Sequence, residues 1–413
     1  MESTQLTHPT LTEFEDAAAF LRDVAVRTPI DLSEHLSDVL GTTVHLKLEN
    51  LQRTGSFKIR GAAYRLSRLT AEERARGVVA ASAGNHAQGV ARAAQKLGIA
   101  ATIFMPLGVP VPKLLATRGY GADVILEGET VETPLRLAAE FAARTGAVLI
   151  HPFDHRDVIV GQGTLGLEIY DDVPDLDTVV LGIGGGGLIA GVAAAVKARA
   201  AAEGRTVRVI GVQAANSAAY PSSLAAGEPL TVETTPTIAD GIAVARPGDV
   251  PFEVIRDLVD EVVTVTDDDI ARALLVLLER AKQVVEPAGA VGVAAILAGK
   301  VAATGTTVAV LSGGNIDPLL LQRVVAHGLA ASGRYMTLQI PLPDRPGQLA
   351  RVSELLSIAG ANVTEVLHTR HGQGLQISEV ILQLSVETRG EEHRAHVISV
   401  LEGAGFQPRV MPD

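Results

Sequence analysis

The chain has 413 residues, of which 47% are apolar and 20% charged, with 41 Gly and 20 Pro. This composition is typical of a globular protein of two or three domains and excludes disordered, collagen-like and coiled-coil classes. A net charge of −12 disfavours nucleic acid as a partner, and the absence of Cys excludes disulfides, thiolate metal sites and a cysteine nucleophile. We therefore expect a packed α/β protein in the reducing cytoplasm.

From about residue 18 to residue 329, short apolar runs alternate with longer helical patterns. Such runs are typical of strands buried on both faces of a mostly parallel sheet. We predict strands at residues 78–81, 101–105, 124–126, 147–150, 179–183, 207–212 and 308–311. The clearest helix, over residues 267–283, begins behind Thr266 and three aspartates, which suit a helix N-terminus.

One stretch, residues 178–196, has nineteen residues without a charge and approaches the length of a membrane span. Six of these residues are glycines, four of them consecutive, which favours a strand, a turn and a helix over one continuous helix. The first twelve residues hold no apolar run. We therefore expect neither a membrane segment nor a targeting segment.

After about Gly333 the pattern changes to period-two strands, which are typical of a one-sided antiparallel sheet. Alternating apolar residues are Leu338, Ile340 and Leu342 in one strand, and Val380, Leu382, Leu384 and Val386 in another. Helices are predicted after residues 344–347 and around residues 391–401. The order β-α-β-β-α-β predicts a ferredoxin-like α+β domain, joined through a small-residue linker at 326–334.

Four loops at predicted strand ends or helix starts are rich in Gly, Ser or Asn, and ligands of open α/β sheets bind at such places. In the loop at residues 54–61, Lys58 lies between Phe57 and Ile59, a setting that favours a desolvated amine of lowered pKa. In the loop at residues 82–86, N–H groups at a helix start suit a carboxylate. A simple N-cap by Ser82 or Asn85 explains the same residues.

The glycines at residues 182–187 precede a helix at 191–200 and favour a phosphate site. Gly182, Gly184 and Gly187 also satisfy the G-x-G-x-x-G pattern, so a dinucleotide site competes. The next strand, however, runs into Gln213, where a ribose-binding acid is expected. In the fourth loop, residues 311–315, the Ser312 hydroxyl follows a strand and suits a heterocycle nitrogen.

An amine, a phosphate site, a carboxylate site and a hydroxyl for a ring nitrogen are the parts that a pyridoxal phosphate enzyme needs. Residues 54–61, 82–89, 184–187, 286–290 and 312–315 together resemble the threonine dehydratases (threonine ammonia-lyases), which are fold-type II pyridoxal phosphate enzymes. The resemblance implies an α/β catalytic domain over residues 1–330, with two open-sheet subdomains like those of the tryptophan synthase β-subunit. The smaller subdomain is expected at about 50–150.

The resemblance also implies a role for each residue that matches the family. Lys58 would bind pyridoxal 5′-phosphate covalently and remove the Cα proton, with Phe57 beside the ring. Asn85 would bond the 3′ oxygen, Ser312 the pyridine nitrogen, and Glu286 would lie near the cofactor. The phosphate would be held by Gly184, Gly185, Gly186, Gly187 and Leu188. The substrate carboxylate would be held by Ser82, Ala83, Gly84, Asn85 and His86.

The implied activity is β-elimination and deamination of L-threonine to 2-oxobutanoate and ammonia, and of L-serine to pyruvate, towards isoleucine or in threonine catabolism. Racemases of this fold carry a serine at the position of Ala83 and divalent-cation carboxylates at those of Gln213 and Ala219. We therefore expect neither racemisation nor a metal site. An L-serine or 3-hydroxyaspartate dehydratase, a nicotinamide-dependent oxidoreductase and a non-catalytic amino-acid sensor are the alternatives.

Residues 344–349 and 360–363 resemble an ACT domain, expected over residues 331–413. The resemblance implies amino-acid sensing at a subunit interface near Gly347 and Asn362, in a homodimer or homotetramer. Isoleucine or valine is the natural effector of an enzyme that leads to branched-chain amino acids. A passive dimerisation sheet is the alternative interpretation.

Overall fold

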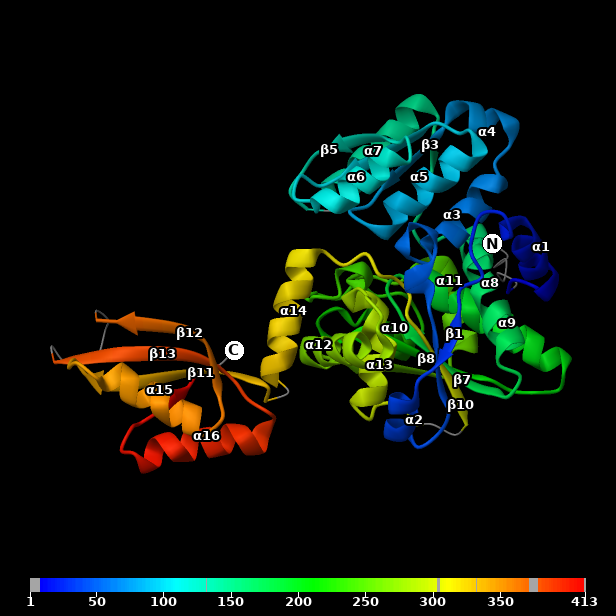
Figure 1. Ribbon diagram of the computed structural model, residues 1–413. Coiled ribbons are helices and arrows are strands. Elements are labelled where there is room, and N and C mark those ends of the chain that lie inside the picture. The colour runs from blue at the N-terminus through cyan, green and yellow to red at the C-terminus, as the bar shows by residue number, and fades with distance from the viewer. Residues whose placement is uncertain (1–7, 131, 303–304, 332, 371–377, 412–413) are drawn as a thin grey trace. The chain divides into compact units, whose positions relative to one another are not determined.

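The computed structural model describes residues 8–130, 132–302, 305–331, 333–370 and 378–411. The chain forms two compact units, Met1–Asp317 and Pro318–Asp413 (Figure 1). Residues 1–7, within which no targeting segment is expected, lie outside the described part. In the described part, no helix combines the length and apolar character that a bilayer crossing requires.

The first unit contains a six-stranded sheet of order β1-β2-β10-β7-β8-β9, in which β1 runs antiparallel to β2 and the other neighbours are parallel. Its strands are β1 (Ile30–Leu32), β2 (Val44–Lys47), β7 (Leu176–Gly182), β8 (Arg208–Ala214), β9 (Glu261–Val265) and β10 (Thr306–Val310). Val179 and Leu181 join the core with α8 (Arg156–Asp172) and α9 (Gly187–Ala202), whereas Val180 faces the opposite way and is equally buried. Both faces of the sheet are therefore covered.

The second sheet of this unit is parallel, has the order β5-β4-β3-β6, and lies between β2 and β7 in the sequence. Its strands are β3 (Val78–Ala81), β4 (Ala101–Met105), β5 (Asp123–Leu126) and β6 (Val148–Leu149). Helices α3 (Lys58–Ser67) and α5 (Asn85–Leu97) pack against each other and share a core with β3 and β4. The two sheets confirm the expected α/β fold with two subdomains.

All seven predicted strands of the first unit are present, but β1, β2 and β9 were not predicted. These three are short or lie near a sheet edge, where no continuous buried run marks them. The remaining helices are α1 (Leu11–Leu21), α2 (Glu34–Leu40), α4 (Ala71–Arg76), α6 (Val111–Gly119), α7 (Glu132–Thr145), α10 (Ala219–Ala226), α11 (Asp249–Leu258), α12 (Asp267–Val276) and α13 (Pro287–Leu297).

The helix predicted over residues 267–283 is shorter in the structure. Helix α12 ends at Val276 and continues as a π-helical turn, Leu277–Ala281. The chain then turns at Lys282, which has a φ of 57°. This turn brings the Gln283 side chain to the Asn50 amide, which donates to it at 2.9 Å.

The second unit begins with α14 (Pro318–Ala331) and continues as β11 (Tyr335–Pro343), α15 (Gln348–Ile358), β12 (Asn362–Thr369), β13 (Glu379–Glu387), α16 (Glu391–Gly403) and β14 (Arg409–Val410). The antiparallel sheet has the order β12-β13-β11-β14, which confirms the ferredoxin-like prediction. Most of the linker expected at 326–334 belongs instead to helix α14, which ends at Ala331. Val324 and Ala330 of this helix are buried, so the helix packs against the protein rather than forming a free connection. The division falls at Asp317, before this helix.

Candidate active site

The loop that follows β10 of the large sheet meets the loop before α3. The Phe57 N–H donates to the Ser312 carbonyl at 3.2 Å, and Ser56 pairs with Gly313 as an isolated antiparallel bridge. Ser312 is buried just beyond the end of β10. Two of the loops singled out in the sequence therefore lie side by side.

Lys58 is the first residue of α3, and its Nζ donates to the Pro152 carbonyl at 3.0 Å. The Nζ lies 5.2 Å from the centroid of the Phe57 ring. Burial lowers the pKa of the amine to about 8, although the nearby Glu286 carboxylate acts in the opposite direction. The lowered pKa makes much more of the amine neutral near neutral pH than for an ordinary lysine, and the neutral form is what attack on an aldehyde requires.

Glu286, the N-cap residue of α13, contacts a second loop of the candidate site. Its Oε1 accepts a hydrogen bond from Asn85 Nδ2 at 2.5 Å. Burial raises the pKa of Glu286 to about 7, and the positive charge of Lys113 opposes this shift. A Cβ on Gly313 would lie 2.2 Å from Glu286 Oε1, so the glycine in the fourth loop makes room for the carboxylate.

Helix α5 begins at Asn85 and is capped by Gly84, not by Ser82 or Asn85 as the simple N-cap interpretation has it. A glycine brings no side-chain acceptor, and the first N–H groups of a helix have no partner within the helix. They are suited to an anion. Ser82 Oγ accepts from the Gly84 N–H at 3.1 Å and shapes the turn.

His86 does not direct its imidazole to this turn. Its Nε2 lies 2.8 Å from the Ile150 carbonyl, so this nitrogen is the donor. Burial lowers the pKa of His86 to about 3, and the positive charge of Lys58 adds to the effect. His86 is therefore neutral, and only its backbone N–H is available to a ligand at this helix start.

The four consecutive glycines, residues 184–187, follow β7 and run into the first residue of α9. Gly186 caps α9 with a φ of 104°, a conformation that L side chains rarely adopt. The Gly185 carbonyl accepts hydrogen bonds from Tyr220 Oη and the Gly248 N–H, both at 3.1 Å. With this carbonyl engaged, the N–H groups that open α9 are the polar groups left for an anion.

Phe153 packs closely against the glycine segment. A Cβ on Gly185 would lie 2.4 Å from this ring, and one on Gly187 would lie 3.0 Å from the Phe153 backbone. Phe153 follows Pro152, whose carbonyl accepts from Lys58. The amine and the glycine segment are thus joined through two consecutive residues.

These features fit pyridoxal phosphate. A buried amine of lowered pKa suits its aldehyde, and a glycine-capped helix start suits its phosphate. A buried hydroxyl at Ser312 suits its ring nitrogen, and the Asn85 amide suits its 3′ oxygen. Asn315 contacts Asn85, and Tyr220 contacts Gly185, although neither residue was predicted as a site residue from the sequence. Asn315 is the last residue of the fourth glycine-rich loop, and this position is the signal that could have identified it.

Gln213 is fully buried. It stands at the position where the racemases of this fold are expected to carry a metal-binding carboxylate. Its Oε1 accepts from the Tyr220 N–H at 2.8 Å, and its amide nitrogen lies 3.4 Å from the carbonyls of Ile183 and Ser217. Among the described residues, no group of three or more His, Asp or Glu side chains could hold a metal ion. The expectation that the protein uses no metal stays a prediction.

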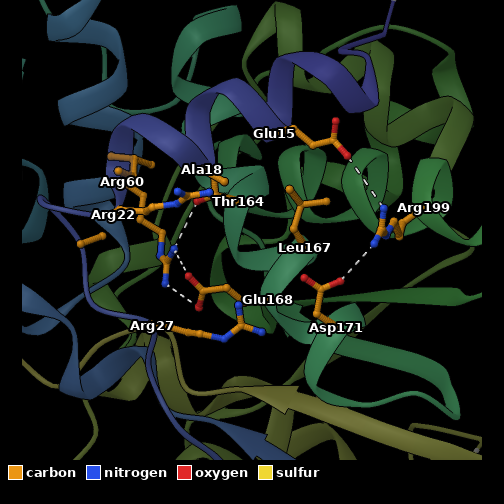
Figure 2. A pocket seen from close by; sticks show the side chains of 12 residues that line it. Glu15, Ala18, Arg22, Arg27, Arg60, Thr164, Leu167, Glu168, Asp171 and Arg199 are labelled. Carbon is orange, nitrogen blue, oxygen red and sulfur yellow. Dashed lines mark hydrogen bonds and ion pairs between the residues drawn. The ribbon is translucent and has the colours of Figure 1, made fainter.

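Figure 2 shows a different pocket, next to α1, α3, α8 and α9. Arg60, two residues beyond the buried lysine, forms its inner wall and bonds to Glu168 at 2.7 Å and to Glu49 at 2.9 Å. Arg199 lies 3.6 Å from Asp171. These charges pair with one another, and the pairs of Arg60 join α3 to α8 and to Glu49.

Comparison with known proteins agrees with this geometry. Residues 21–313 match the family described as pyridoxal-phosphate dependent enzyme, and residues 336–405 match the ACT domain. The chain is 47% identical over 403 residues to an L-threonine ammonia-lyase of Thermotoga maritima, covering 97% of this chain and 99% of that protein. A threonine deaminase structure from Solanum lycopersicum is similar with a TM-score of 0.72 and 38% identity, over 77% of this chain and 93% of that one.

A maize serine racemase structure is also similar, with a TM-score of 0.73 and 35% identity over 78% of this chain and 99% of that one. The chain therefore belongs to the pyridoxal-phosphate dependent enzymes of fold-type II. Its particular form combines this catalytic unit with a C-terminal ACT domain.

Proposed function

We propose that the protein is an ammonia-lyase that converts L-threonine to 2-oxobutanoate and ammonia, and also L-serine to pyruvate. The observation that carries the proposal is the Lys58 amine, which bonds to the Pro152 carbonyl and lies near the charge of Glu286. The pKa of this amine is lowered to about 8, and Lys58 directly follows Phe57, whose backbone bonds to Ser312. The Thermotoga maritima protein named L-threonine ammonia-lyase supports it, since it is similar over almost the whole of both chains.

Each site residue has a distinct task in this proposal. When bound, pyridoxal phosphate supplies a ring system that accepts electrons from the substrate Cα. Lys58 holds the cofactor and moves the Cα proton, while Phe57 packs beside the ring. The N–H groups of Gly184, Gly185, Gly186, Gly187 and Leu188 hold the phosphate. The turn formed by Ser82, Ala83, Gly84, Asn85 and His86 holds the substrate carboxylate.

Two further side chains are assigned to the ring. Ser312 bonds the pyridine nitrogen, and its neutral hydroxyl leaves that nitrogen largely unprotonated. Elimination tolerates the weaker electron sink because the departing β-hydroxyl itself takes up electrons. Asn85 bonds the 3′ oxygen and is tied to Glu286.

Serine racemisation is the second candidate, because the maize serine racemase shares the fold at 35% identity. Racemisation needs a proton donor on the face opposite Lys58. Ala83, whose methyl group carries no exchangeable proton, occupies the position where racemases of this fold have that donor. We therefore favour elimination, and leave the choice among threonine, serine and 3-hydroxyaspartate to the relative rates on the three amino acids.

The test compares the purified holoenzyme with Lys58→Ala and with the exposed-lysine control Lys96→Ala. We expect the wild type and the control to be yellow and to release 2-oxobutanoate from threonine. Lys58→Ala should lose the covalent cofactor and about 10³-fold or more of the activity. A colourless protein that binds nicotinamide nucleotide would support an oxidoreductase, and colour without turnover would support an amino-acid sensor.

We also propose that the second unit is a regulatory ACT domain that binds isoleucine or valine at Gly347 and Asn362. Gly347 caps α15, so the N–H groups of that helix start meet no side-chain cap of its own, and Asn362 opens β12. We expect the enzyme to act in the cytoplasm as a homodimer or homotetramer. An apolar row on the first unit, Leu107, Val111 and Leu115, is about 60% exposed and supports self-association.

A further inference from the structure

We propose that Asn315 is a positioning residue that fixes the direction in which the Asn85 amide points. The proposal rests on the proposed function, in which Asn85 bonds the 3′ oxygen of the cofactor. It assigns a task to a residue that contacts the Asn85 side chain and has no role of its own in the proposed function.

The argument starts from a group whose role in hydrogen bonding is fixed. The backbone carbonyl of Thr54 can only accept, and it lies 2.7 Å from Asn315 Nδ2. The amide nitrogen of Asn315 therefore faces Thr54. The same nitrogen lies 2.8 Å from the Asn85 side chain, which must present its oxygen, Oδ1, to this donor.

Because Asn85 Oδ1 faces Asn315, the amide nitrogen of Asn85, with its two N–H bonds, faces away from Asn315. One of them is donated to Glu286 Oε1 at 2.5 Å. The second is available to an acceptor in the site. A reversed Asn85 amide would set nitrogen against nitrogen at Asn315 and, when Glu286 is ionised, oxygen against oxygen at Glu286. The contact with Asn315 therefore fixes the direction of the series from Thr54 to Glu286.

The backbone holds Asn315 in place. A Cβ on Gly55 would lie 2.3 Å from Asn315 Oδ1, so the glycine creates the space that the side chain fills. The Gly314 N–H donates to the Gly55 carbonyl at 2.8 Å and joins the two loops. Thr54 itself has a φ of 66°, rare for a threonine, and this conformation belongs to the turn that offers its carbonyl to Asn315.

The consequence is chemical as well as structural. An N–H group aimed at the 3′ oxygen favours the anionic form of that oxygen, whereas a carbonyl oxygen in its place would repel it. The direction of the Asn85 amide thus influences where the cofactor holds its proton. That proton distribution is visible in the absorption spectrum of the bound cofactor.

The experiment uses the full-length holoenzyme with Asn315→Asp and Asn315→Ala. The matched control is Asn216→Asp, which removes an exposed amide that also donates to a backbone carbonyl, that of Pro236, at 2.7 Å. We expect Asn315→Asp to shift the pH midpoint of the visible absorption band by about one unit and to lower kcat about tenfold. KM should change by about twofold or less, and Asn315→Ala should give an intermediate effect. The control should match the wild type.

The outcomes separate the inference from the proposed function. If the wild-type protein shows no cofactor band, the proposed function fails. If both Asn315 variants fold, bind the cofactor and keep the wild-type pH midpoint, the inference fails, even if their melting temperatures fall. Should Asn315→Asp not fold, the spectrum of Asn315→Ala decides in the same way.

Discussion

The charge states of individual side chains give this site a pH dependence. The pKa of Lys58 lies near 8 because burial disfavours its ammonium form, and the Glu286 carboxylate holds that pKa higher than it would otherwise be. The neutral amine, which is the form that reacts with an aldehyde, therefore increases as the pH rises through about 8. Removal of the Glu286 charge should move this transition to lower pH.

For Glu286→Gln we predict that the rate at which apoenzyme captures pyridoxal phosphate reaches half its maximum at a lower pH than in the wild type. Stopped-flow absorbance across pH 6 to 10 measures this midpoint. The exposed-carboxylate variant Glu228→Gln should leave it unchanged. An unshifted or raised midpoint in Glu286→Gln would show that the carboxylate does not act on Lys58 through its charge.

At the scale of elements, the position of α3 depends on a buried ion-pair network. Arg60 bonds to Glu168 of α8 (Figure 2). Arg60 also bonds to Glu49, in the short helix Glu49–Leu51, and Glu168 pairs with Lys47 of β2 at 2.8 Å. Removing one member of such a network leaves its partners charged and buried. The arrangement fixes the helix that carries the reactive lysine.

We predict that Arg60→Met lowers the free energy of unfolding by about 3–5 kcal/mol, because Glu49 would be left buried without its partner. Arg136→Met is the matched control, since Arg136 pairs with Glu140 at an exposed site on α7, and it should cost less than ~1 kcal/mol. Urea unfolding of the apoenzyme measures both. Equal losses in the two variants would mean that the network contributes no more than a surface pair.

At the scale of the whole molecule, the catalytic unit and the ACT domain fold around separate hydrophobic cores. Regulation therefore requires that an effector bound to the ACT domain changes the activity of the catalytic unit. Two glycines with positive φ cap the two long helices of the ACT domain: Gly347 on α15 and Gly390 on α16. A Cβ at either position meets no described atom within 4 Å. Gly347 has a ψ of −13° and Gly390 a ψ of 179°, so alanine strains the backbone at both positions and more strongly at Gly390, but the proposed effector site includes only Gly347.

We predict that Gly347→Ala raises the concentration of isoleucine or valine needed for half-maximal effect about tenfold or more. Gly390→Ala should change it by about twofold or less, and neither variant should alter threonine turnover without effector. Titration of activity with each amino acid measures the response. An equal change in both variants would indicate strain in the domain rather than a ligand site at Gly347.

Features that depend on residues close together in the sequence could be predicted, whereas features that depend on contacts between distant residues could not. Buried strands and glycine-rich turns are local patterns, so the two sheets, the ferredoxin-like order and the loops of the candidate site could be predicted. The contact of Asn315 with Asn85 joins residues 230 positions apart, and the direction of an amide has no local signature. The lowered pKa of Lys58 was predicted from its apolar neighbours in the sequence, whereas the raised pKa of Glu286 depends on burial that only the folded chain reveals.

The close packing of Phe153 against the glycine segment has a consequence for protein engineering. Space for a side chain at position 185 is taken up by an aromatic ring from another loop, so a larger residue there would collide with it before reaching any bound anion. A larger residue at 185 alone would clash with the Phe153 ring, and a smaller residue at 153 alone would leave a cavity, so libraries that vary only one of these positions would contain few well-packed variants. Useful redesign of this contact should exchange volume between residues 153 and 185 in the same variant.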